Sequence, residues 1–184
     1  MAVMTHYDSF AHTATGGVPS LCTYNVRGLS ASALNKDIVR TGKIANVKNL
    51  VSKYGVTFIQ ETRLSPAHSY FKHFFPKSFV NYSSKSSQSA GTATIVNEST
   101  LRRYSAKALQ LPPSLQGYIQ ATLLTPRDSI GPRLLYINCY LYTGPQQAKV
   151  KRTQLKTLIH SLLPTNCLTF LGGDFNFTLS TSDT

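Results

Sequence analysis

Short runs of apolar residues recur along the chain, separated by polar or glycine-containing segments. Runs rich in β-branched and aromatic residues predict strands, whereas Ile44, Val47 and Val51 recur at helical spacing over residues 36–54. A strand, this helix and a second strand indicate a β-α-β unit and hence an α/β fold. The expected strands cover residues 21–26, 56–59, 79–82, 92–96, 117–124, 133–140 and 168–171.

Proline and glycine mark the limits of the predicted elements. Gly144 and Pro145 favour the start of a second helix, which is expected to run to about residue 163. Residues 1–18 lack such a pattern and are expected to be a flexible N-terminal lead-in. Pro19 marks the start of the fold, and no linker divides the chain after it, so residues 19–184 are expected to form one domain.

The charge balance adds a prediction about partners. The chain has 19 Lys and Arg residues against 7 Asp and Glu residues, a formal net charge of +12. Such a chain attracts polyanions, which favours DNA as a partner, although a general solubility bias would give the same composition. For the basic face of the later helix, plain exposure to solvent is the alternative to DNA contact. The candidate nucleic-acid-binding residues are Arg27, Arg63, Lys149, Arg152 and Lys156.

The three cysteines bear on the compartment. Cys22, Cys139 and Cys167 lie in apolar, strand-like runs without the spacing of metal ligands, which indicates reduced core residues of an intracellular protein. The first twenty residues lack the apolar stretch of a secretory signal, and no later run is long enough to span a bilayer. We therefore expect a protein that is not secreted and has no membrane partner.

Polar residues follow three of the expected strands. Asn25 ends the first, Glu61 follows the second, and Asp174 and Asn176 follow the last. A carboxylate at the end of a buried strand is costly unless a cation or hydrogen bonds satisfy it, and Mg²⁺, with Mn²⁺ as a substitute, suits such a site. The pattern predicts metal-dependent phosphodiester cleavage. Taken singly, Asn25 also fits a turn residue and Glu61 a surface charge.

Four segments resemble successive signature blocks of the endonuclease/exonuclease/phosphatase superfamily. They are residues 24–29 (Tyr-Asn-Val-Arg-Gly-Leu), 58–62 (Phe-Ile-Gln-Glu-Thr), 137–140 (Ile-Asn-Cys-Tyr) and 173–176 (Gly-Asp-Phe-Asn). Their order and spacing match over roughly residues 20–184. The first and last blocks look most like the apurinic-type endonuclease domain of non-LTR retrotransposons. The resemblance implies a DNase I-like α/β fold, a two-sheet sandwich of mixed strands flanked by helices.

The resemblance also implies roles for the matching residues. Glu61 would be the Mg²⁺ ligand, with Asn25 beside it orienting metal-bound water or phosphate. Asp174 would align or deprotonate the attacking water, and Asn176 would hold the scissile phosphate. Tyr140 would donate its hydroxyl group to a phosphate oxygen, although an ordinary strand aromatic is the alternative.

The family pattern continues with further strands and a terminal Ser-Asp-His, which residues 177–184 do not carry. We therefore expect a fold that is incomplete at its C-terminus and a fragment with impaired catalysis. The parent element would nick nuclear target DNA for a fused reverse transcriptase. The alternatives are a non-catalytic nucleic-acid-binding remnant and a phosphatase or sphingomyelinase-type member of the superfamily.

Overall fold

The computed structural model describes residues 9–12, 17–29, 36–64, 69–84, 90–141, 153, 155–156 and 167–176. Within these residues, helices and strands are mixed along the chain, as in an α/β fold. In chain order they are β1 (Ser9–His12), β2 (Leu21–Asn25), α1 (Lys36–Lys53), β3 (Val56–Gln60), η1 (Ser69–Phe74), β4 (Phe79–Ser83), β5 (Thr92–Val96), α2 (Glu98–Arg103), β6 (Tyr104–Leu109), η2 (Pro113–Leu115), β7 (Ile119–Pro126), β8 (Arg133–Tyr140) and β9 (Cys167–Asp174).

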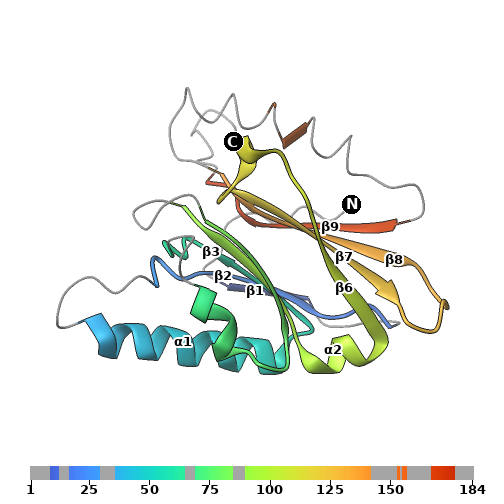
Figure 1. The fold of residues 1–184 in the computed structure, drawn as a ribbon, viewed down its shortest axis with the longest axis horizontal. Coiled ribbons are helices and arrows are strands. Elements are labelled where there is room, and N and C mark those ends of the chain that lie inside the picture. The colour runs from blue at the N-terminus through green and yellow to red at the C-terminus, as the bar shows by residue number, and fades with distance from the viewer. Residues whose placement is uncertain are drawn as a thin grey trace, which may run out of the picture.

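The first sheet has five strands in the order β1-β2-β3-β5-β4. Strands β2 and β3 are parallel, because α1 carries the chain back along the sheet between them, and the other pairs are antiparallel. Helix α1 buries Ile44, Val47 and Val51 in one cluster with Ile59 and Ile95 of this sheet. Figure 1 shows α1 lying along the outer face of the five-stranded sheet, with the other sheet on the opposite side.

The second sheet has four strands in the order β6-β7-β8-β9. Strands β6, β7 and β8 pair antiparallel, whereas β9 is parallel to β8. The two mixed sheets pack face to face with helices outside them (Figure 1), which confirms the predicted sandwich. No helix in the described part of the chain is long and apolar enough to cross a membrane.

The layer between the sheets changes character along its length. At one end it is aromatic: the ring of Tyr136 lies 4.9 Å from that of Phe170 and 6.2 Å from that of Phe58. Toward the carboxyl ends of β3 and β8 it becomes polar, where Gln60 Nε2 donates to Asn138 Oδ1 at 2.8 Å. Asn138 Nδ2 in turn donates to two backbone carbonyls of the first sheet, so hydrogen bonds join the sheets at this end.

Several elements differ from the sequence predictions. Residues 9–12, which were predicted to be part of the flexible lead-in, form β1 and pair with β2. The start of the single domain at residue 19 stays a prediction. Helix α2 and strand β6 were not predicted, and β7 begins at Ile119 instead of residue 117. Strand β9 extends through both glycines and includes Asp174, which the sequence places just after the strand. Most of the helix expected at 145–163 lies outside the described residues.

Candidate active site

The ends of β2, β3 and β9 bring three polar side chains together. Asn25 ends β2, Glu61 follows β3 directly, and Asp174 ends β9. The amide nitrogen of Asn25 donates to Glu61 Oε1 and to Asp174 Oδ2, each at 2.9 Å. One carboxamide therefore links two carboxylates that lie more than one hundred residues apart in the chain. We call Asn25, Glu61 and Asp174 the carboxylate cluster.

The loops that carry the cluster have unusual backbone conformations. Arg27, Glu61 and Asn176 have φ values of 48°, 53° and 47°, in the left-handed region that non-glycine residues seldom occupy. Two hydrogen bonds hold the first two loops against each other, one of them from Gly28 N to Glu61 O at 2.7 Å. Strained residues of this kind persist where the surroundings fix them, and they are frequent at functional sites.

Asp174 is held by its own loop as well as by Asn25. The backbone nitrogen of Asn176 donates to Asp174 Oδ1 at 3.0 Å, and Leu141 N donates to the backbone carbonyl of Asp174 at 2.8 Å. The side-chain amide nitrogen of Asn176 donates to the carbonyl oxygen of Leu141. Asn176 thus lies next to the cluster, and its amide nitrogen supports the loop in this state.

Tyr140, at the end of β8, lies against the cluster. Its ring stacks on that of Tyr118, with the centroids 6.5 Å apart and the planes parallel. Burial raises the pKa of the Tyr140 phenol. The negative charges of Glu61 and Asp174 raise this pKa further, and Glu61 also accepts the hydrogen bond of the phenol. The phenol is therefore protonated at neutral pH and able to donate a hydrogen bond.

We expect Tyr140→Phe to leave the absorbance titration of the folded protein near pH 10 unchanged. Because the pKa of Tyr140 is raised in the folded state, its contribution to stability is present below pH ~10 and is lost as the pH rises above that value. Tyrosinate absorbance of wild type and variant, followed from pH 8 upwards, checks this. If the variant shows a smaller absorbance change near pH 10, by the amount that one tyrosine contributes, Tyr140 is not buried beside Glu61 and Asp174 as described.

The predicted nucleic-acid-binding residues have different surroundings. Arg63 pairs with Glu61, its guanidinium nitrogen 2.9 Å from Oε2, while its own side chain is 45% exposed. Arg27 and Lys156 are exposed, and Lys149 and Arg152 lie outside the described residues. The sequence did not single out Lys43, whose Nζ donates to the carbonyl oxygens of Arg27 and Gly28 and so supports the first loop.

The donor set of the cluster fits a hard cation with few protein ligands. The described residues contain no group of three or more His, Cys, Asp and Glu side chains that could hold a metal. Glu61 and Asp174 supply two carboxylates, and Mg²⁺ is commonly held by one or two carboxylates together with water and phosphate oxygens. Glu61 is 15% exposed, so solvent and substrate can reach it. Such a set suits Mg²⁺ better than an ion that demands a closed protein cage.

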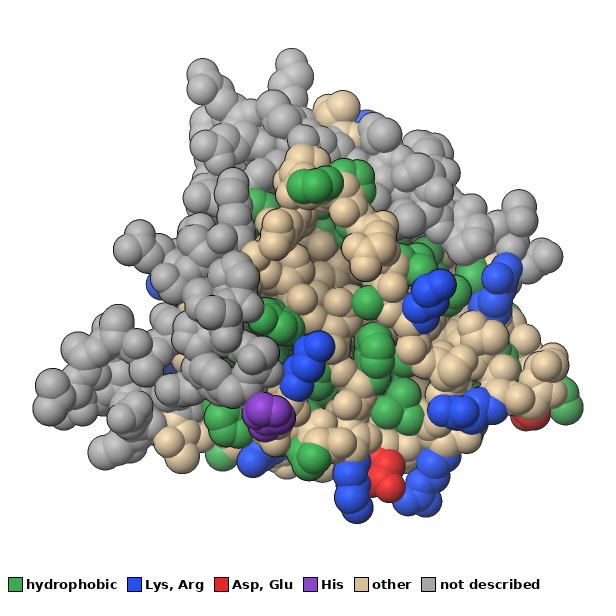
Figure 2. Space-filling model, in the orientation of Figure 1, with side chains coloured by type: hydrophobic (Ala, Val, Ile, Leu, Met, Phe, Trp, Pro, Cys, Tyr) green, Lys and Arg blue, Asp and Glu red, His purple; other side chains and the backbone are tan. Residues whose placement is uncertain are grey.

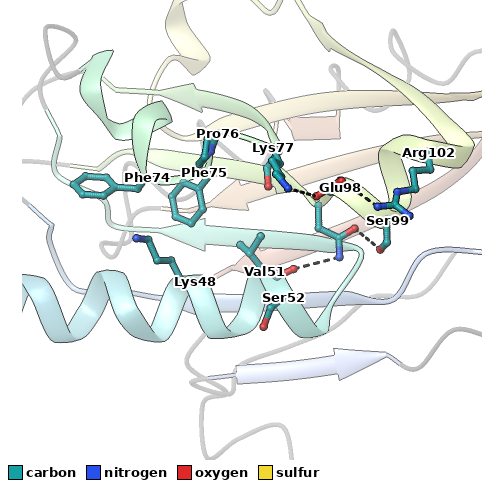
Figure 3. A pocket seen from close by; sticks show the side chains of 12 residues that line it. Lys48, Val51, Ser52, Phe74, Phe75, Pro76, Lys77, Glu98, Ser99 and Arg102 are labelled. Atoms are coloured by element: carbon teal, nitrogen blue, oxygen red, sulfur yellow. Dashed lines mark hydrogen bonds and ion pairs between the residues drawn. The ribbon is translucent and has the colours of Figure 1, made fainter.

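A cavity elsewhere on the molecule is not part of this site. Its volume is about 460 Å³, and it lies between α1, the turn before β4 and α2. Figure 3 shows Lys48 pointing toward Phe74 and Glu98 paired with Lys77 and Arg102. These residues adjoin the amino end of β3, whereas the carboxylate cluster lies at its carboxyl end.

Comparisons with known proteins identify a family that matches the chain and solved structures that share its fold. The model of the Endonuclease/Exonuclease/phosphatase family matches residues 22–184. No curated protein sequence matches the chain. Three solved structures share the fold. D. rerio TDP2 complexed with single strand DNA product is 18% identical with a TM-score of 0.59, and the match covers 86% of this chain and 60% of that chain. AP endonuclease LMAP from Leishmania major is 19% identical with a TM-score of 0.59 (83% of this chain, 53% of that chain), and 3′ phosphatase NExo from Neisseria bound to product DNA hairpin is 17% identical with a TM-score of 0.58 (89% of this chain, 60% of that chain). The chain thus spans less than two thirds of each.

Proposed function

The chain belongs to the endonuclease/exonuclease/phosphatase family, whose members are hydrolases acting on phosphodiester bonds, and we propose that it is a Mg²⁺-dependent phosphodiester hydrolase that nicks DNA. The observation that carries the proposal is the link from Asn25 to both Glu61 and Asp174. Two carboxylates with an oriented amide provide what diester hydrolysis needs, a cation site next to a group that can position water.

Glu61 would hold the cation, which supplies charge neutralisation at the phosphate when it is bound. Asn25, whose amide nitrogen faces both carboxylates and whose oxygen accepts from Arg27 N, would lie beside it and orient metal-bound water or phosphate. Asp174 would orient the attacking water and take its proton, because its carboxylate is fixed by hydrogen bonds to both oxygens. Tyr140 would donate its hydroxyl group to a non-bridging phosphate oxygen, and Asn176 would hold the same phosphate. Arg63 would turn from Glu61 toward the substrate phosphate, with Arg27 beside it.

The charge of the surface supports DNA as the substrate. The formal net charge of +12 favours a polyanion over a small neutral molecule. Figure 2 shows Lys and Arg side chains over the described part of one face, with few acidic ones among them. Two of the similar structures hold DNA products, TDP2 and NExo. These points favour nicking of DNA over the phosphatase or sphingomyelinase alternative.

Incubation of supercoiled plasmid with the chain tests the proposal. We expect open-circular product only when Mg²⁺ or Mn²⁺ is present, formed at the low rate of a chain with impaired catalysis, and binding without cleavage when EDTA removes the metal. Binding with no nicking in either buffer would instead support the non-catalytic remnant. Cleavage in EDTA would contradict the metal dependence.

DNA binding by the chain is expected to be electrostatic. If the protein covers about five phosphates, the logarithm of the binding constant should fall against that of salt concentration with a slope of roughly −4 to −5. Fluorescence anisotropy with a labelled duplex at four salt concentrations measures the slope. A slope near zero, or a strong preference for one of two duplexes with unrelated sequences, would count against backbone binding.

We further propose that the nicking exposes a 3′ hydroxyl for reverse transcription in a non-LTR retrotransposon. The form of the blocks at 24–29 and 173–176 supports this, and it implies a reverse transcriptase fused in the same reading frame and action in the nucleus. Sequencing the transcript downstream of residue 184 tests it, since a polymerase region in the same frame is expected. A stop codon or an unrelated domain there would refute the proposal.

A further inference from the structure

A second cavity lies between the two sheets, at the end of the sandwich that carries the carboxylate cluster. Its volume is about 390 Å³, and it is lined by β4, by the start of β7 and by the segment that joins β6 to β7. A cavity of this size is within the range of small-molecule sites in proteins. We call it the amide cavity, after the carboxamides of Asn81, Gln110, Gln116 and Gln120 in its lining.

The lining of the amide cavity carries no charged side chain. Apart from the four carboxamides it offers the hydroxyl groups of Tyr82 and Ser83, and its remaining walls are apolar, with Leu109, Leu111 and Pro112 among them. A neutral lining in a chain of net charge +12 does not suit a phosphate. It suits a neutral ligand that is flat enough to lie against apolar walls and polar at its edges.

One of the carboxamides is in a state that favours a ligand with a hydrogen-bond donor. Gln120 is only 3% exposed, and its Nε2 donates to Asn81 Oδ1 at 3.4 Å. Asn81 is itself oriented, since its Nδ2 donates to Thr122 Oγ1 at 3.1 Å. The Oε1 of Gln120 accepts no hydrogen bond from the residues that the structure describes. A buried acceptor in this state is unfavourable, and a donor that Gln120 can turn to meet removes the penalty.

The amide cavity adjoins the candidate active site through the second sheet. Gln120 is directly opposite Asn138 in the β7–β8 ladder, and Asn138 precedes Tyr140 by two residues. At the rise of an antiparallel strand, two residues correspond to about 7 Å. The rim is also tied to the segment before β5, because Gly117 N donates to Ser83 Oγ and Gly117 O accepts from Gly91 N. The carbonyl oxygen of Gly91 in turn accepts from Thr62 N in the loop after β3. A strand with its phosphate at the carboxylate cluster can therefore place a neighbouring base at the cavity.

We propose that the amide cavity is a base-binding subsite that receives a nucleobase with an exocyclic amino group from the bound nucleic acid. Carboxamides are the side chains that pair with the edge of adenine, and neutral, partly apolar pockets are where proteins hold unstacked bases. This inference rests on the proposed function, because it presumes that a nucleic-acid strand lies at the carboxylate cluster.

Binding of two short single strands that differ in one chemical group tests the subsite. One strand contains adenosine, and in the other purine riboside, which lacks the 6-amino group, replaces it. In EDTA, so that no cleavage intervenes, we expect wild type to bind the adenosine strand about 2- to 10-fold more tightly, the worth of one hydrogen bond. Equal affinity for the two strands would overturn the inference, since the cavity would then hold water only.

A pair of variants locates the effect. Gln120→Leu removes the carboxamide at nearly constant volume and should abolish the difference between the strands, while the salt dependence of binding stays as in wild type. Asn49→Leu removes an exposed carboxamide on α1, away from the cavity, and should preserve the difference. A Gln120→Leu protein that still discriminates as wild type does would contradict the role of Gln120.

Two further outcomes keep the test decisive. If Gln120→Leu fails to fold, NMR of wild type decides, because adenosine but not purine riboside should shift the side-chain amide signals of Gln120 and Asn81. Failure of the proposed function gives a different result. If the chain does not nick DNA with metal present but still binds the adenosine strand more tightly in EDTA, the hydrolase proposal fails and the base-binding subsite holds for a protein that only binds nucleic acid. A wild-type chain that binds neither strand refutes both.

Discussion

Replacing Glu61 with Gln should abolish metal-dependent nicking of plasmid DNA and weaken metal binding while leaving the fold intact. Glutamine keeps the shape of the side chain, and its oxygen can still accept the hydrogen bond from Asn25 that Glu61 Oε1 accepts. The other carboxylate oxygen becomes an amide nitrogen, so the pairing with the exposed Arg63 is lost together with the negative charge that would hold the cation. Replacing a residue that hydrogen-bonds a metal ligand typically lowers metal affinity roughly 10- to 100-fold. Removing the charge of the ligand itself should therefore lower metal affinity roughly 100-fold or more.

A matched substitution makes the Glu61 result interpretable. Glu98→Gln removes an equal charge from a surface carboxylate that pairs with Lys77 and Arg102, beside the cavity in Figure 3. It should leave Mn²⁺ binding, measured by calorimetry, and the nicking rate unchanged. Circular dichroism checks that both variants fold. Wild-type metal affinity in Glu61→Gln would remove Glu61 from the metal site, even if the nicking rate of the wild type proved too low to compare.

The fold could be predicted where a helix is long enough to show a period or where a strand is rich in β-branched and aromatic residues. The helix at 36–54 was confirmed because Ile44, Val47 and Val51 share one buried face. The strand at 56–59 was confirmed because its β-branched and aromatic residues are buried on both faces of the sheet. Strand β1 (Ser-Phe-Ala-His) has no β-branched residue, and helix α2 has six residues, too few for a helical period to appear. A local signal for α2 was present in Asn97, whose side chain caps the helix by accepting from Thr100 N. Strand β6 alternates only weakly, with Lys107 in its middle.

The candidate site was predictable as a place but not as a set of contacts. Parallel strands end at one edge of a sheet, so Asn25 and Glu61 had to be neighbours. That Asp174 meets them from the other sheet depends on how the two sheets pack, which no local pattern encodes. The pair of Gln60 and Asn138 was visible as polar residues inside apolar runs, a signal of buried hydrogen bonding that the prediction did not use.

The backbone at the end of β9 explains the glycine that precedes Asp174. Gly173 has a φ of 133°, a conformation that side chains other than glycine rarely adopt. A Cβ atom at this position would overlap the carbonyl oxygen of Cys139 and lie 2.8 Å from its carbonyl carbon and amide nitrogen. Strand β9 pairs with β8 here, so neither backbone can withdraw without breaking the ladder that places Asp174 opposite Tyr140.

Gly173→Ala should therefore destabilise the protein by about 4 kcal/mol or more, as backbone strain and a clash with main-chain atoms add. The free energy of unfolding of a typical domain is about 5–15 kcal/mol, so a loss of this size leaves the variant only marginally stable or unfolded. Urea unfolding measures the loss. Gly42→Ala in α1 is the matched control, because a Cβ there meets nothing within 4 Å, and alanine should stabilise the helix by roughly 0.5–1 kcal/mol. If Gly173→Ala unfolds at the wild-type urea concentration, the register of β8 with β9, and with it the approach of Asp174 to Asn25, is wrong.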